Sequence, residues 1–129
     1  NNKLLVEIDP VNRLWINDRA AKRLGIRDGD AVELVDSKGN SQGSLPAKVT
    51  PGIREDCVYT VHGFGSRSPM LKRAYQRGVS DNELMLRHAP DEDTGATGMR
   101  VNFVTVRKAR KPRRWPRPLA SLRPRRRSA

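Results

Sequence analysis

The sequence predicts a mainly β domain with short helices, followed by a basic tail. Short valine-rich apolar runs alternate with turn residues over positions 1–106, a pattern typical of β proteins. Only the stretches 18–24 and 70–78 have helical spacing of their apolar residues. The chain has 129 residues, a length that fits one domain of roughly 100–150 residues.

The first elements are a strand and a capped helix. Residues 14–17 (LWIN) are typical of a strand. Asn17 is expected to cap a helix over 18–24, because its side-chain oxygen can accept the amide hydrogens of the first turn. Gly25 follows between two apolar residues, which predicts a left-handed C-terminal cap.

A hairpin and a core strand are expected next. Residues 31–36 (AVELVD) and 44–50 (SLPAKVT) flank turn residues at 38–40, which favours a β-hairpin. Pro46 suits an edge position or a bulge, because proline has no N–H for the ladder. Residues 57–61 (CVYTV) form an apolar run that predicts a core strand with Cys57 buried in it.

The second half of the domain changes character. Residues 62–69 (HGFGSRSP) predict a loop that leaves the core strand, and functional residues commonly lie on such loops. The segment 70–78 is expected to be helical, residues 89–98 form a polar loop, and 100–106 (RVNFVTV) form a closing strand.

The net charge of the chain is concentrated at its end. Up to Val106 there are 15 basic and 14 acidic residues, a sum of +1, whereas the last 23 residues hold 11 basic and no acidic residues. Arginine and proline with few apolar residues predict disorder, so we expect a domain at 1–108 and a disordered tail at 109–129. Trp115 among these arginines keeps open an alternative function, a β-barrel protein that binds nucleic acid through its tail.

Composition excludes several classes of site. The chain has a single cysteine, which rules out an internal disulfide, a cysteine-rich zinc site and a self-contained iron–sulfur cluster. No apolar run approaches the roughly 20 residues that span a bilayer, and the first ten residues lack the pattern of a signal peptide.

His62 begins the motif that bears most directly on ligand binding. Gly63 and Gly65 reduce side-chain bulk around Phe64 and can offer backbone amides to an anionic or heteroaromatic group. A tight turn is the alternative. Metal ligation is disfavoured, because His88 is the only other histidine. The nearby serines lack a nucleophile-elbow spacing, and the acids at 91–93 lack the ligand spacing of a calcium loop.

Four blocks of sequence together carry a family resemblance. They are residues 16–40, residues 47–65 ending in VHGFG, residues 78–85 (GVSDNELM) and residues 94–106 (TGATGMRVNFVTV). In order and spacing they resemble the C-terminal molybdopterin-dinucleotide-binding domain of the dimethyl-sulfoxide-reductase family, over residues 1 to 108. The motifs are most similar to those of thiosulfate, polysulfide and tetrathionate reductases, with arsenate reductases nearby.

The resemblance implies a six-stranded double-psi β-barrel that lacks its first strand region here. It implies that the chain holds part of a molybdopterin guanine dinucleotide, the cofactor that chelates molybdenum or tungsten, and has no catalytic residue or metal ligand of its own. A 4Fe-4S cluster would belong to the parent enzyme only. Expected partners are the remainder of the catalytic subunit, an iron–sulfur electron-transfer subunit and a membrane anchor subunit, with no specific nucleic acid. The expected compartment is the periplasm.

The resemblance also assigns cofactor contacts. These fall on Asn1, Asn2, His62, Gly63, Asp81, Asn82 and Arg100. An asparagine amide can donate to and accept from a pterin, and a pyrophosphate favours backbone amides and a guanidinium. The alternatives are an Asx turn for Asp81 and Asn82 and a surface ion pair for Arg100.

Overall fold

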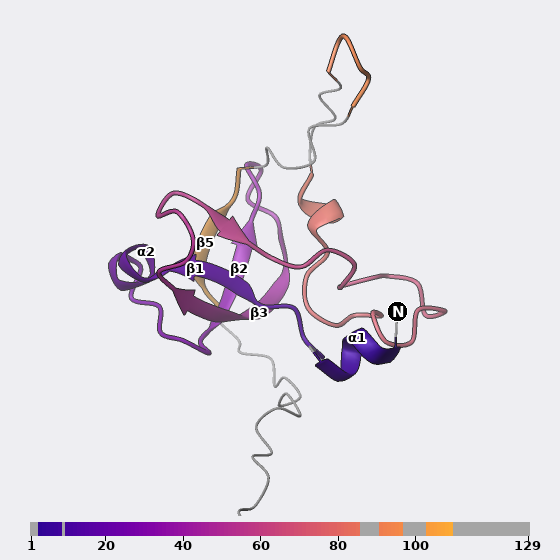
Figure 1. Cartoon of the computed structure of the whole chain (residues 1–129), viewed down its shortest axis with the longest axis horizontal. Helices are drawn as coiled ribbons and strands as arrows, with labels where there is room; N and C mark the ends of the chain where they lie inside the picture. The colour runs from indigo at the N-terminus through magenta and orange to yellow at the C-terminus, as the bar shows by residue number, and fades with distance from the viewer. Residues whose placement is uncertain (1–2, 9, 86–90, 97–102, 110–129) are drawn as a thin grey trace, which may run out of the picture.

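Five strands form one curled sheet in the computed structural model, which describes residues 3–8, 10–85, 91–96 and 103–109. Within these ranges the sheet order is β4-β1-β3-β2-β5 (Figure 1). The strands are β1 Leu14–Asn17, β2 Ala31–Val35, β3 Ser41–Thr50, β4 Val58–Tyr59 and β5 Thr105–Lys108. The helices are α1 Lys3–Ile8, which the sequence did not predict, α2 Asp18–Arg23, and a 3-10 helix, Asp81–Leu84. The mainly β class is therefore confirmed, with the sheet curled like half of a barrel.

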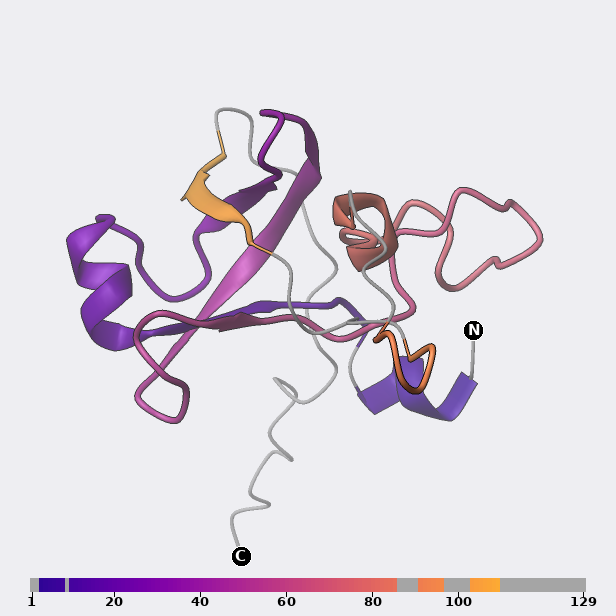
Figure 2. The same cartoon turned by 90° about the horizontal axis from the view of Figure 1, so that it is seen from above.

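The long strand β3 joins the two halves of the sheet. Its residues 41–46 pair antiparallel with β2, and residues 47–50 pair parallel with β1. Pro46 therefore lies inside the middle strand of the sheet, at the point where the pairing passes from β2 to β1. The edge or bulge position expected for Pro46 is therefore wrong: this residue lies opposite Ala31 in the central strand, one residue before the pairing with β1 begins at Ala47. Figure 2 shows the two halves of the sheet turned at an angle to each other, with β3 passing between them.

The caps of α2 have the predicted chemistry. The Asn17 side-chain oxygen accepts from the backbone N–H of Arg19 at 2.9 Å. At the other end, Gly25 has a φ of +64°. The N–H of Ile26 donates to the Ala21 carbonyl at 2.8 Å, and that of Gly25 to the Lys22 carbonyl at 3.2 Å. These two bonds define a Schellman motif, so both ends of the helix are determined by local sequence.

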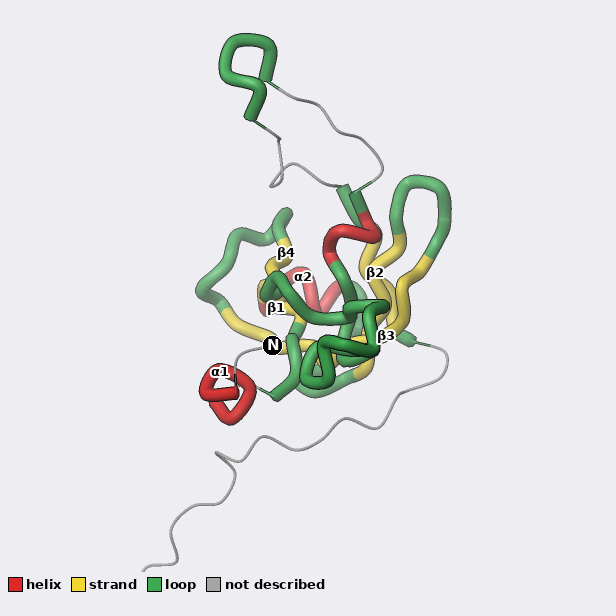
Figure 3. The backbone as a smooth tube through the Cα atoms, turned by 90° about the vertical axis from the view of Figure 1, so that its right-hand side faces the viewer, coloured by secondary structure: helices red, strands yellow, loops and turns green. Residues whose placement is uncertain are grey.

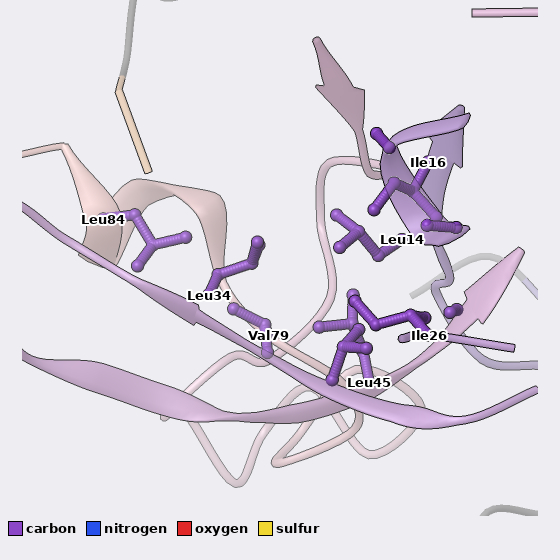
Figure 4. Packing of buried hydrophobic residues seen from close by; sticks show 11 residues of the cluster. Leu14, Ile16, Ile26, Leu34, Leu45, Val79 and Leu84 are labelled. Carbon is purple, nitrogen blue, oxygen red and sulfur yellow. The ribbon is translucent and has the colours of Figure 1, made fainter. Parts of the chain in front are cut away.

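The core lies on the inner face of the curled sheet. Leu14, Ile16, Val32, Leu34 and Leu45 come from three different strands and are at most 2% exposed. Figure 4 shows Val79 and Leu84 packing into the same cluster. Burying an aliphatic side chain of this size stabilises the fold by about 1.5–3 kcal/mol. Val79 and Leu84 therefore hold the segment 79–84 against the sheet.

The helix predicted over 70–78 is wrong. The N–H groups of Ala74 and Tyr75 both bond to the Leu71 carbonyl, which makes a single turn. Beyond it the backbone pairs with an earlier loop instead: Ser66 donates to the Ala74 carbonyl, and Gln76 donates to that of Ser66. The i to i−4 hydrogen bonds of a helix cannot form while these groups are occupied elsewhere.

The core strand predicted over 57–61 is shorter and less buried than expected. Only Val58 and Tyr59 form β4, which pairs with β1 alone and lies at the edge of the sheet. Tyr59 is 50% exposed, and Cys57 is exposed instead of buried. The cysteine ends a turn in which its N–H donates to the Arg54 carbonyl, and this places it outside the sheet.

The closing strand is confirmed only in its later part. β5 spans Thr105–Lys108, while residues 100–102 of the prediction lie outside the described residues. Phe103 is 85% exposed. Most of the predicted tail, residues 110–129, also lies outside the described residues, so the domain boundary stays a prediction. Within the described part of the chain, no helix is long and apolar enough to span a bilayer.

Candidate functional site

The structure brings together two of the motifs that the sequence singled out. His62 Nδ1 lies 2.8 Å from Asp81 Oδ2 and 2.9 Å from Oδ1. An ionised carboxylate can only accept a hydrogen bond, so Nδ1 donates and Nε2 remains for another partner. The side chains are 60% and 31% exposed. This pair therefore faces outward, where a ligand can reach it.

Glycines allow the two site loops to approach closely. Gly63, Gly65 and Gly78 have φ values of +92°, +69° and +73°, a region that L side chains rarely adopt. A Cβ at Gly65 would lie 2.3 Å from the backbone nitrogen of Ser80. The loop 62–67 and the segment 78–83 are therefore in backbone contact. Figure 3 shows the loops in green and the 3-10 helix in red.

Asn12 connects these loops, and the sequence interpretation missed it. The side chain is fully buried. Its Nδ2 donates to the Val79 carbonyl at 3.0 Å and to Thr60 Oγ1 at 3.2 Å, and its Oδ1 accepts from the Val79 N–H at 3.4 Å. No local pattern reveals this role, because the partners lie 48 and 67 residues away.

A polar cleft of about 460 Å³ lies between the two loops. It is lined by Gly65, Ser66, Arg67, Gln76, Gly78, Ser80 and Glu83. Arg67 and Glu83 form an ion pair of 2.7 Å. Between Ser66 and Arg77 the chain has four basic residues and no acidic residue. The loop beside the cleft is thus positively charged, a property suited to an anionic ligand.

Two polar groups at this site have no hydrogen-bond partner within the described part of the chain. They are the Asn82 side-chain amide and the backbone N–H of Gly63. Asn82 is exposed, next to the His62–Asp81 pair along the chain. The remaining predicted contacts, Asn1, Asn2 and Arg100, lie outside the described residues.

These residues fit a polar, anionic heterocyclic ligand. Adjacent amides with left-handed glycines suit phosphate oxygens, and a side-chain amide suits the donors and acceptors of a heteroaromatic ring. Across the described ranges, no group of three or more histidine, cysteine, aspartate or glutamate residues could hold a metal ion.

A polar cleft beside two glycine-containing loops on a curled β sheet is suited to binding an anionic ligand. The chain matches the family model of the molybdopterin dinucleotide-binding domain over residues 1–110, and it belongs to this family.

Two curated relatives are similar to the chain. The molybdopterin-containing subunit of thiosulfate reductase from Salmonella typhimurium is 33% identical over 82 residues, covering 64% of this chain and 11% of that protein. The molybdopterin-containing subunit of arsenate respiratory reductase from Chrysiogenes arsenatis is 29% identical over 107 residues, covering 78% of this chain and 12% of that protein. The chain thus spans about a tenth of the length of each relative.

Proposed function

We propose that the chain holds one end of a molybdopterin guanine dinucleotide between the loop 62–67 and the segment 78–83, as part of a larger catalytic subunit. The observation that carries this proposal is that the Asn82 amide and the Gly63 N–H lack partners beside the His62–Asp81 pair, next to a polar cleft, in a domain of this family. Asn82 would contact the pterin end, and the Gly63 amide would meet a phosphate oxygen. Asn1, Asn2 and Arg100 would complete the contacts.

The chain's own residues would bind and orient the cofactor and would take no part in bond making. When bound, the cofactor supplies the redox chemistry of its molybdenum or tungsten. His62 would be held by Asp81 so that Nε2 meets the cofactor. Asp81 itself is a weaker candidate for direct contact, because a carboxylate repels phosphate and its oxygens are already occupied by His62.

For the parent enzyme we propose reduction of a sulfur compound, namely thiosulfate, polysulfide or tetrathionate. Similarity to a thiosulfate reductase subunit supports this assignment. Similarity to an arsenate reductase subunit supports the wider class of oxyanion reductases. A 4Fe-4S cluster in the parent, an iron–sulfur partner subunit, a membrane anchor subunit and a periplasmic location belong to the same proposal.

We also propose that the five-stranded sheet is the main part of a six-stranded double-psi β-barrel. The open side between β4 and β5 supports this idea, because these two strands end the sheet order and each has one neighbour. A further strand would come from outside the described residues.

Asn82→Leu in the full-length catalytic subunit tests the cofactor assignment. We expect a five- to hundredfold loss of cofactor retention. In the variant, the pterin group that Asn82 would contact is buried without its hydrogen bond, which costs about 1–3 kcal/mol. Guanine nucleotide released by acid hydrolysis and molybdenum content measure the retention. The matched control is Asn40→Leu, an exposed asparagine in the turn before β3. Wild-type nucleotide and metal content in Asn82→Leu would reduce Asn82 to a turn residue.

A further inference from the structure

Asn12 lies where both site loops begin. It lies two residues before β1, and its side chain reaches Thr60 and Val61, just before His62, and Val79, two residues before Asp81. On one side its Nδ2 donates to Thr60 Oγ1 and, at 3.5 Å, to the Val61 carbonyl. On the other side Nδ2 and Oδ1 bond both the carbonyl and the N–H of Val79.

A side-chain amide meets the demands of this position. Val79 presents a donor and an acceptor together, and the Asn12 amide satisfies both. The neighbouring loop residue must be a glycine for this approach, since a Cβ at Gly78 would lie 1.7 Å from Asn12 Oδ1. Because the group is fully buried, its hydrogen bonds do not compete with water.

The His62–Asp81 pair, in contrast, is open to solvent. Exposed ion pairs of this kind contribute little to holding their own geometry, because water competes for both partners. Their separation must therefore be set by the backbone that carries them. Asn12 ties Val61, the neighbour of His62, to Val79, two residues before Asp81.

We infer that Asn12 is the positioning residue of this cofactor site: its buried amide sets the two loops so that Asp81 accepts from His62 Nδ1 and Nε2 faces the ligand. This inference rests on the proposed function, in which Nε2 of His62 contacts the bound cofactor. Asn12 itself touches no ligand.

The test is nuclear magnetic resonance of the full 129-residue chain, labelled with ¹⁵N. Long-range proton–nitrogen spectra show which ring nitrogen carries the proton, and His62→Gln identifies the His62 signals against those of His88. At mildly alkaline pH we expect the proton on Nδ1 in the wild type. Asp81→Ala gives the spectrum of the ring without its partner, and Asn12→Ala should reproduce that spectrum.

Asn17 provides a matched control. It is also a buried asparagine, 9% exposed, and it bonds the Arg19 N–H and the Ile53 carbonyl far from the site. Asn17→Ala should lower the melting temperature and leave the His62 ring as in the wild type. Asn12→Asp, which keeps the shape and loses the donor, is the second variant and should act like Asn12→Ala.

The outcomes separate this inference from the proposed function. A folded Asn12 variant with the wild-type His62 spectrum would overturn the positioning role. So would failure of both Asn12 variants to fold, because Asn12 would then serve overall stability. If the spectrum changes as expected but the full-length subunit keeps its guanine nucleotide in both Asn12→Ala and Asn82→Leu, the positioning stands and the cofactor assignment fails.

Discussion

The contact between the two site loops predicts unequal effects for two alanine substitutions in one motif. Gly63 and Gly65 both have positive φ, so alanine at either position costs about 1–3 kcal/mol of backbone strain. At Gly63 a Cβ meets no atom within 4 Å. At Gly65 it lies 2.3 Å from the Ser80 nitrogen, where 3.4 Å is an ordinary contact, so the loops must separate by 3.4 − 2.3 = 1.1 Å.

Gly65→Ala should therefore destabilise the domain more than Gly63→Ala does. Overpacking of this kind costs about 1–3 kcal/mol, and each kcal/mol lowers the melting temperature of a domain this size by about 4–8 °C. Thermal unfolding followed by circular dichroism measures the difference, with Gly63→Ala as the strain-only control. Equal melting temperatures for the two variants would refute the backbone contact between the loops.

Three further predictions concern other parts of the chain. Burial alone would raise the pKa of the Asp36 carboxyl, but hydrogen bonds from Asn40 and from the Lys38 N–H outweigh it and lower the pKa. The ionised Asp36 carboxylate thus stabilises the fold at pH values above its ordinary pKa of about 3.9, and this stabilisation is lost as the pH falls further. As the pH is lowered through this range, the melting temperature of the wild type should drop more steeply than that of Asp36→Asn. Parallel curves of melting temperature against pH for the two proteins would contradict this. Cys57, being exposed, should react with iodoacetamide in the folded chain as fast as in urea, measured by mass spectrometry; protection until unfolding would show that it is buried. Removal of residues 111–129 keeps the hydrogen bond from Ala109 to the Ala31 carbonyl, so the melting temperature should stay unchanged while salt-sensitive DNA binding is lost. Sequence-dependent DNA binding that survives the removal would contradict this and would place a nucleic-acid site on the domain itself.

Local chemistry explains which parts of the fold the sequence predicted well. Both caps of α2 depend on residues within a few positions of one another, as Asn17 and Gly25 show. The hairpin of β2 and β3 likewise depends on one turn. Such elements are predictable because their hydrogen bonds close within the segment that is being interpreted.

Long-range pairing explains the failures. The segment 70–78 has helical spacing, but its backbone bonds to Gly65 and Ser66. Cys57 belongs to an apolar run, yet β4 lies at the sheet edge and leaves the thiol exposed. No pattern within these segments records which strand or loop will lie beside them.

The residues of the candidate site also differ in whether the sequence alone could indicate them. The resemblance to a family assigned His62, Gly63, Asp81 and Asn82, and the structure brings the first and third of these into contact. No sequence pattern indicated Asn12, because its hydrogen-bond partners are distant along the chain. The candidate side chains were thus assigned from motifs, whereas the residue that we propose positions them could be recognised only from the fold.

The most direct test of the central claim is an experimental structure of the full-length catalytic subunit with its dinucleotide bound. We predict that the Asn82 side chain lies within hydrogen-bonding distance of the pterin, and that the N–H of Gly63 points at the cofactor. The contradicting result is a dinucleotide held entirely by other parts of the subunit, with the loop 62–67 and the segment 78–83 facing solvent.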